Sequence, residues 1–297
     1  MFTGLLGACW LWPGSETPPA LIEGPSNSIQ EPPPAAQASP ALKVVAAAAS
    51  TPSLPKPAVT PDVMAQWTQG FSSEQPYALA LRLRDARLPG SFGAALTLTH
   101  ACRSAMGQVR AGELLGPDSD PLLRGKNEPN YAQRVQARDS LERRCLAFSQ
   151  HRDIDMPLAD DHPGQTLNQA IYLFPYFFAT GKARQFAQIL AEQGQLQHFL
   201  PMLPYWDGKA MTEEGDRQVY NGAMNLAVKL ATAPTVAPDQ DIRLLAACLS
   251  QGHCAKDFIE LHRMNSPQDT EERRRVEALA QEMVAAMRAG DYQKFAR

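Results

Sequence analysis

Residues 91–106, SFGAALTLTHACRSAM, carry the clearest folding signal in the chain. Their spacing of apolar and small side chains is that of one face of an α-helix, three or four residues apart. The residues on this face are Phe92, Ala95, Thr99, Cys102 and Met106. Ser91 is a residue type that often caps the first turn of a helix. The stretch therefore predicts a helix that is capped by Ser91 and buries one apolar stripe.

The same period recurs on both sides of this stretch. Further segments with helical spacing lie at 61–67, 76–88, 131–148, 182–194, 195–203, 213–232, 241–252, 257–264 and from 267 onward. No segment shows sustained alternation of apolar and polar residues, so no sheet is expected. No fixed repeat recurs along the chain. We therefore predict an all-α fold, either an irregular helical bundle or a short solenoid-like array of antiparallel helix pairs.

The first sixty residues differ from the rest in composition. About a third of them are proline or alanine, few are charged, and the first arginine of the chain is Arg82. Such a stretch buries too little apolar surface to offset the entropy lost on ordering. We expect residues 1–60 to form a disordered, Pro/Ala-rich tether and residues 61–297 to form a single all-helical domain.

Leu6-Gly7-Ala8-Cys9 resembles a bacterial lipobox, in which a cysteine is lipidated after signal cleavage. No Lys or Arg precedes it, and its apolar run is shorter than the usual signal core of about 7–15 residues. A translation start upstream of Met1 would explain both departures, and a chance match is the alternative. With Cys9 as a candidate lipidation site, the tether would span about 40 Å as a flexible coil.

Four cysteines of the predicted domain fall into two plausible pairs. Cys102 and Cys145 each lie on the apolar face of a predicted helix, and Cys248 and Cys254 flank a glycine-containing corner. Cysteines paired in this way predict two disulfides, which persist where thiols are kept oxidised. Free buried thiols are one alternative. A zinc site at the second pair is another, but its spacing matches no usual ligand pattern.

The segment 151–162 holds the densest cluster of groups able to bind a metal. They are His151, Asp153, Asp155, Asp160, Asp161 and His162. Imidazoles and carboxylates together could hold Zn²⁺, Mn²⁺ or Fe²⁺ and activate a water, as in a metal-dependent hydrolase. A solvated acidic loop is the alternative, since aspartate beside proline and glycine is usual in turns. The sequence has no HExxH, GxSxG, Walker or dinucleotide motif, so no catalytic residue and no cofactor is predicted.

Tyr205 and Trp206 precede Asp207-Gly208, a dipeptide typical of a tight corner. Because Trp206 lies at this predicted corner, we expect it to be an exposed contact for a partner, with Tyr205 beside it. The alternative is core packing at a helix junction kinked by proline.

Charge excludes some functions. A formal net charge of -3 argues against non-specific nucleic-acid binding. No apolar run reaches the roughly 20 residues of a membrane span. We expect the arginines of the domain on solvated helix faces. They include Arg82, Arg84, Arg87, Arg103, Arg143 and Arg144.

Together these features favour an exported helical protein of the periplasm or cell envelope. We expect it to bind or scaffold a partner, either a protein or another envelope component, and to contact the membrane only through its N-terminus. One alternative is the metal-dependent hydrolase that uses residues 151–162. The other is a cytosolic helical scaffold with free thiols.

Overall fold

The structure is a computed structural model, and it describes residues 61–159, 161–162, 164–165, 205–211, 213–268, 270–289 and 291–295. These residues belong to one compact unit that spans 51–297. Cys9, Asp160, the Pro/Ala-rich segment and the predicted helices between 182 and 203 lie outside the described residues.

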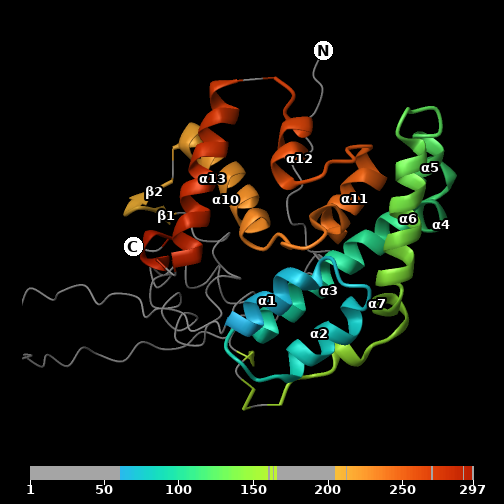
Figure 1. Ribbon diagram of the computed structural model, residues 1–297, viewed down its shortest axis with the longest axis horizontal. Coiled ribbons are helices and arrows are strands. Elements are labelled where there is room, and N and C mark those ends of the chain that lie inside the picture. The colour runs from blue at the N-terminus through green and yellow to red at the C-terminus, as the bar shows by residue number, and fades with distance from the viewer. Residues whose placement is uncertain are drawn as a thin grey trace, which may run out of the picture. The chain divides into compact units, whose positions relative to one another are not determined.

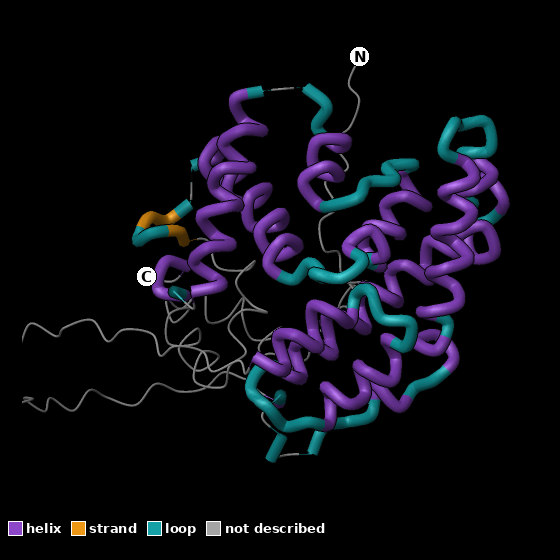
Figure 2. Tube along the Cα trace, viewed as in Figure 1, coloured by secondary structure: helices purple, strands orange, loops and turns teal. Residues whose placement is uncertain are grey.

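Helices make up most of the described chain, which confirms the predicted all-α fold (Figures 1 and 2). The α-helices are α1 (Pro61–Gly70), α2 (Pro76–Asp85), α3 (Ser91–Val109), α4 (Ala111–Leu115), α5 (Pro121–Arg124), α6 (Tyr131–Cys145), α7 (Ala147–Gln150), α10 (Glu214–Ala231), α11 (Ile242–Gln251), α12 (Phe258–Asn265) and α13 (Glu271–Ala289). The 3₁₀ turns are η1 (Pro117–Ser119), η2 (Asp153–Asp155), η5 (Pro238–Gln240) and η6 (Tyr292–Phe295).

One small hairpin interrupts the helices, and Figure 2 shows it in orange. Strands β1 (Tyr205–Trp206) and β2 (Lys209–Ala210) pair in antiparallel register. The two corner residues, Asp207 and Gly208, have φ angles of 49° and 77°. Positive φ at both central residues is the requirement of a type I′ hairpin turn, which Asp-Gly meets at low cost. The sequence located this corner but did not predict the short strands around it.

The first hydrophobic cluster is built around α3. Its stripe of Phe92, Ala95, Thr99, Cys102 and Met106 is buried as the spacing predicts. Side chains of α1, α2, α6 and α11 join most of this stripe in one core. The helix begins at Ser91, but Gly90 is the N-cap residue. The Ser91 hydroxyl instead donates a hydrogen bond of 2.8 Å to the Leu88 carbonyl, so the predicted serine cap is wrong.

The second hydrophobic cluster lies between α10, α12 and α13. Figure 1 shows α10 beside α13, and the two helices pack along their length. A Cβ at Gly222 of α10 would lie 3.2 Å from Val276 of α13. The absence of a side chain at Gly222 therefore lets the two helices approach closely.

Helix α11 takes part in both clusters. Ile242 and Leu249 belong to the first cluster, and Leu244 belongs to the second. A ten-residue helix with apolar residues on two faces is typical of an element buried between two layers. Helix α11 also packs against α6.

Candidate functional site

A cavity of about 260 Å³ lies between α6 and α11. Residues of η5 line one part of it, and residues 254–256, which follow α11, line another. We call this cavity the α6–α11 groove. It holds several times the roughly 30 Å³ that one water occupies in the liquid. It is slightly smaller than the usual range for drug-sized ligands, which begins near 300 Å³.

Helix α6 contributes a polar stripe to the groove. Gln133, Gln136, Ala137 and Ser140 are three to four residues apart and therefore lie on one face of the helix. Ser140 is 9% exposed, and its hydroxyl oxygen has no hydrogen-bond partner among the described residues. A hydroxyl buried in this way costs about 1–3 kcal/mol unless another molecule hydrogen-bonds to it. Because this oxygen has less than 1 Å² of accessible surface, it lies beneath the wall of the groove and is not open to it.

The opposite wall of the groove is apolar. It consists of Leu244, Leu245 and Cys248 of α11. Cys254 and Ala255 extend this apolar surface beyond the helix. The charged lining residues are Asp239 in η5 and Lys256 in the segment before α12. A ligand here would meet primary amides and one charge of each sign on a partly apolar surface.

Arg144 of α6 fixes the end of the groove at η5. Its guanidinium donates hydrogen bonds of 2.8 Å to the main-chain oxygens of Gln240, Phe71 and Ser73. Burial lowers the pKa of this guanidinium, while the charges of Glu74 and Asp241 oppose that shift. Arginine nevertheless stays protonated in proteins, so three carbonyls converge on one buried cation. The expectation that Arg144 is solvated is wrong.

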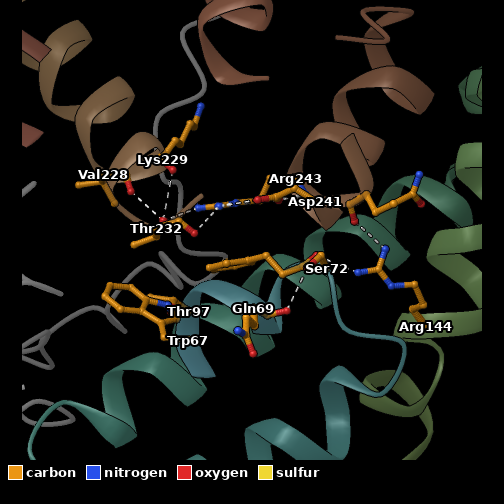
Figure 3. Close-up of polar contacts among 12 residues, drawn as sticks. Trp67, Gln69, Ser72, Thr97, Arg144, Val228, Lys229, Thr232, Asp241 and Arg243 are labelled. Carbon is orange, nitrogen blue, oxygen red and sulfur yellow. Dashed lines mark hydrogen bonds and ion pairs between the residues drawn. The ribbon is translucent and has the colours of Figure 1, made fainter. Parts of the chain in front are cut away.

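Asp241 and Arg243 hold the first turn of α11, as Figure 3 shows. The fully buried carboxylate of Asp241 accepts a hydrogen bond of 2.8 Å from the Arg243 main-chain N–H, which caps the helix. It also accepts 3.0 Å and 2.6 Å hydrogen bonds from the Arg243 guanidinium. At its other edge the guanidinium donates to the Thr232 hydroxyl and carbonyl, 2.8 Å and 3.2 Å away. This network joins α11 to the end of α10.

The Arg243 guanidinium also stacks on two aromatic rings. Its central carbon lies 3.7 Å from the ring centroid of Phe71 and 4.7 Å from that of Phe258. Phe71 belongs to the first hydrophobic cluster and Phe258 to the second. Arg243 is therefore a cationic link between the two clusters, with its charge balanced by Asp241.

The other end of the groove is fixed by a disulfide and a second buried arginine. Cys248 of α11 is bonded to Cys254, with their Cα atoms 4.1 Å apart. Arg134 of α6, which is 2% exposed, donates a 3.0 Å hydrogen bond to the main-chain oxygen of Leu249 and a shorter one to that of Pro121. The side-chain amide of Asn130 donates to the Gly252 carbonyl. Both walls of the groove are thus tied together at each end.

The second predicted disulfide is also present. Cys102 of α3 and Cys145 of α6 are bonded, with their Cα atoms 5.1 Å apart. The structure therefore contains both predicted disulfides. The link joins α3 to the last residue of α6, beside Arg144. With all four sulfur atoms in disulfides, none is a free thiolate that could bind zinc.

Arg87, which follows α2, and Arg103 of α3 bind the acidic segment 151–162. Arg87, just after α2, donates to both carboxylate oxygens of Asp161 at 2.7 Å and 3.1 Å. Arg103 of α3 donates a 2.8 Å hydrogen bond to Asp155, and Arg152 adds one of 3.2 Å. Hydrogen bonds from these arginines lower the pKa of both aspartates. Arg87 and Arg103 were expected on solvated helix faces, and in the structure both also form ion pairs with aspartates of this segment.

The remaining members of the predicted metal cluster are dispersed. His162 accepts a 2.9 Å hydrogen bond from the Gly164 N–H at Nδ1, and its Nε2 lies 2.9 Å from the Arg84 carbonyl, to which it donates. Both ring nitrogens are thus occupied. His151 is exposed beside Tyr77, and Asp153 accepts from the Tyr77 hydroxyl at 3.5 Å. Within the described residues no group of three His, Cys, Asp or Glu side chains could hold a metal ion, and Asp160 lies outside them.

Trp206 is buried rather than exposed. Its exposed fraction is 7%, and its ring centroid lies 4.9 Å from that of Phe295 in an edge-to-face arrangement. The ammonium of Lys294 lies 5.7 Å from the tryptophan ring centroid. The expectation of an exposed tryptophan is wrong, because η6 covers the hairpin. Tyr205 is partly exposed.

The groove was not predicted from the sequence. Its α6 stripe is polar and in part exposed, and a search for apolar periodicity does not detect such a face. The closest available signal was the regular spacing of Gln133, Gln136 and Ser140 within the helix. The long-range contacts that enclose it come from segments about a hundred residues away, such as 239–240.

Comparisons with known proteins give this chain no relative: no family matches it, and neither does any curated protein or solved structure. Among the helices of the described residues, none has the length and apolar character needed to cross a bilayer.

Proposed function

We propose that this chain is an exported protein of the bacterial periplasm or cell envelope that acts by binding a partner. The observation that carries the proposal is the pair of intrachain disulfides, Cys102–Cys145 and Cys248–Cys254. A helical domain of this size can bury a sufficient core without disulfides. Disulfides in such a domain therefore point to an oxidising compartment rather than to a need for extra stability.

The binding role is supported by the α6–α11 groove. Buried arginines and a disulfide fix both of its ends, as a preorganised site requires. Its lining is a mixture of amide, charged and apolar groups, which is typical of recognition.

Thiol counting on protein taken from its native cells tests the compartment. Cells would be lysed directly into an alkylating reagent and denaturant, and labelled cysteines located by mass spectrometry. We expect Cys102, Cys145, Cys248 and Cys254 to be unlabelled without reductant and fully labelled after reduction. Labelling of all four without reductant would contradict the proposed export.

Lipid attachment at Cys9 belongs to the same proposal. A diacylglyceryl group on Cys9 would make the Pro/Ala-rich segment a tether, with a reach of about 150 Å as polyproline II. The wild-type protein should then enter the detergent-rich phase of a Triton X-114 extract, and Cys9→Ser should remain in the aqueous phase. Equal partitioning of the two proteins would contradict the anchor but leave the disulfide argument intact.

A further inference from the structure

We propose that the Cys248–Cys254 disulfide is a redox-active site that exchanges with an external dithiol, while the Cys102–Cys145 disulfide stays oxidised in the folded protein. The two bonds differ in their accessibility, in the length of chain that they close and in the hydrogen bonds around them. This inference goes beyond the binding role proposed above, and it does not depend on the compartment.

Accessibility separates the two disulfides first. Cys102 and Cys145 both have an exposed fraction of 0% and lie within the first hydrophobic cluster. Exchange requires a thiolate to reach a sulfur atom, so this bond is protected unless the core opens. Cys248 is 5% exposed, but Cys254 is partly exposed, and both residues line the α6–α11 groove. Cys254 is therefore the end of the second bond that faces a thiol in solution.

Reduction of the Cys248–Cys254 bond should leave the fold intact. The bond links residues only 6 positions apart, so breaking it restores little entropy to the unfolded chain. Hydrogen bonds also hold this corner. The Gly252 N–H donates to the Cys248 carbonyl at 3.0 Å, and the Cys254 N–H donates to the Gly252 carbonyl at 3.2 Å. Arg134 holds the adjacent Leu249 carbonyl from α6. The two thiols would therefore stay close together and re-form the bond readily.

The other disulfide lacks this property. Cys102 and Cys145 lie 43 positions apart, on α3 and α6. Breaking a bond that closes so long a loop restores much more entropy to the unfolded chain. Its loss would therefore weaken the fold itself, which suits a permanent structural link and not a reversible exchange.

Asn130 supplies a hydrogen-bond donor to the exposed sulfur. Its Nδ2 lies 3.8 Å from Cys254 Sγ and also donates to the Gly252 carbonyl. A hydrogen bond to an ionised group favours the ionised form. The same amide would therefore stabilise a Cys254 thiolate, and exchange is faster when the departing sulfur is a more stable thiolate.

The exchange balances in two steps. A thiolate of the dithiol attacks Cys254 Sγ, which forms a mixed disulfide, and the electron pair of the broken bond leaves on the Cys248 sulfur. The second thiolate of the dithiol then attacks its own sulfur in the mixed disulfide, which closes the disulfide of the reagent and releases Cys254 as a thiolate beside Asn130. Overall two electrons and two protons pass from the dithiol to the two cysteines.

The test compares the two bonds in one sample. The oxidised full-length chain is treated with dithiothreitol at neutral pH without denaturant, free thiols are alkylated at intervals, and mass spectrometry locates them. We expect Cys248 and Cys254 to be reduced about 100-fold faster than Cys102 and Cys145. Far-UV circular dichroism should stay unchanged, and ¹H–¹⁵N shift changes should be concentrated at residues 248–257. In denaturant, where both bonds are open to solvent, this difference in rate should disappear.

A parallel experiment distinguishes the source of the dithiol. Reduced thioredoxin, a protein dithiol, replaces dithiothreitol at the same concentration. Faster reduction of Cys248–Cys254 by thioredoxin would support exchange with a protein partner. Faster reduction by dithiothreitol would support exchange with small thiols at the same bond.

Single-cysteine variants test which sulfur is attacked. Cys248→Ala leaves Cys254 as a free thiol, and Cys254→Ala leaves Cys248. With oxidised glutathione, Cys254 should form a mixed disulfide about tenfold faster than Cys248, and equal rates would contradict attack at Cys254.

The role of Asn130 is tested in the Cys248→Ala background by the pH dependence of alkylation. Asn130→Ala should raise the pKa of the Cys254 thiol, because it removes the donor that favours the thiolate. Asn225→Ala, at an exposed site on α10, is the matched control and should leave this pKa unchanged. An unchanged pKa in the Asn130→Ala variant would contradict the role of this amide.

The outcomes separate the two proposals. Equal rates for both bonds without denaturant, or a Cys248–Cys254 bond that resists reduction until the protein unfolds, would overturn the exchange site and leave the proposed export unaffected. If all four cysteines were free in native cells, but the oxidised protein still exchanged selectively at Cys248–Cys254, only the proposed export would be contradicted.

Discussion

Arg144 Nη2 donates a hydrogen bond of 2.8 Å to the main-chain oxygen of Phe71, which lies 73 positions earlier in the chain. This bond satisfies the carbonyl of a residue that directly follows α1. The same guanidinium also donates hydrogen bonds to the main-chain oxygens of Ser73 and Gln240. The adjacent Arg143 is 62% exposed and pairs with the equally exposed Glu74. Two neighbouring arginines of one helix thus have opposite environments.

Replacement of Arg144 should therefore be costly and replacement of Arg143 should not. Arg144→Met leaves three carbonyls without their donor, and we expect a loss of about 3–5 kcal/mol in the free energy of unfolding. Arg143→Met removes a solvated ion pair and should cost less than about 1 kcal/mol. Urea unfolding followed by circular dichroism measures both. Similar losses for the two variants would show that the buried bonds of Arg144 do not stabilise the fold.

Arg243 should require its planar guanidinium and not only its charge. Lysine at this position cannot stack on Phe71 while bonding to both Asp241 and Thr232. We expect Arg243→Lys to lower the free energy of unfolding by about 2–3 kcal/mol. Arg217→Lys, at an exposed site on α10, is the matched control and should change it by less than about 0.5 kcal/mol. If Arg243→Lys left the free energy of unfolding unchanged, the positive charge alone would be sufficient for the stabilising role of Arg243.

The two disulfides should contribute unequally to stability. In the chain-entropy model, the Cys102–Cys145 link closes 43 residues and is worth about 4 kcal/mol. The Cys248–Cys254 link closes 6 residues and is worth about 2 kcal/mol. The double variants Cys102→Ala/Cys145→Ala and Cys248→Ala/Cys254→Ala, compared by urea unfolding, should differ in this order. The reverse order would mean that native-state geometry outweighs loop closure.

Gly252 should tolerate a side chain less well than Gly208, although both have positive φ. A Cβ at Gly252, with φ of 74°, would lie 2.8 Å from a carboxylate oxygen of Glu128, which is bonded to Arg134. A Cβ at Gly208 would meet nothing within 4 Å. We expect Gly208→Ala to cost about 1 kcal/mol from backbone strain and Gly252→Ala about 2 kcal/mol. Thermal and urea unfolding of both variants tests the difference.

Acid should weaken the attachment of the segment 151–162. Hydrogen bonds from Arg103 and Arg152 lower the pKa of the Asp155 carboxyl group in the folded protein. The ionised carboxylate therefore stabilises the fold above the unfolded pKa of aspartate, which is about 4. This stabilisation is lost as the pH falls through the lower pKa of the folded state. Asp155→Asn should therefore destabilise the protein near pH 6, by less than about 1 kcal/mol because the pair is partly exposed. Near pH 3 the difference from wild type should shrink.

Unfolding midpoints measured at several pH values give this comparison. The matched control is Asp139→Asn on α6, which is exposed and should show little pH-dependent difference. A difference for Asp155→Asn that stays constant between about pH 6 and about pH 3 would contradict the role of its ionised form.

The helices and the cysteine pairs could be predicted because their signals are local. The buried stripe of α3, from Phe92 to Met106, followed from spacing alone. The pairing of Cys102 with Cys145 followed from two apolar helix faces and from the even number of cysteines, four, in the predicted domain. Helix ends were less predictable: α2 ends at Asp85, although the first strong breaker is the Pro89-Gly90 corner.

The burial of polar residues could not be predicted in this way. Arg134 and Arg144 were expected on a solvated face because charged residues are rarely buried without partners. Their partners are main-chain carbonyls of Leu249, Phe71 and Gln240, which no spacing rule within α6 can reveal. Trp206 was missed for the same reason, since it is covered by Phe295 from the far end of the chain.

By itself, the sequence determined that the domain is helical, where its apolar stripes lie and how its cysteines pair. These properties depend on periodicity and on residue type, both of which are carried by short segments. Only the tertiary structure decided which arginines are buried, that α11 joins two hydrophobic clusters, and that α6 and α11 line a groove. The physical reason is that a buried polar group is stable only when a distant segment supplies its hydrogen-bond partners, and that supply depends on the packing of the whole chain.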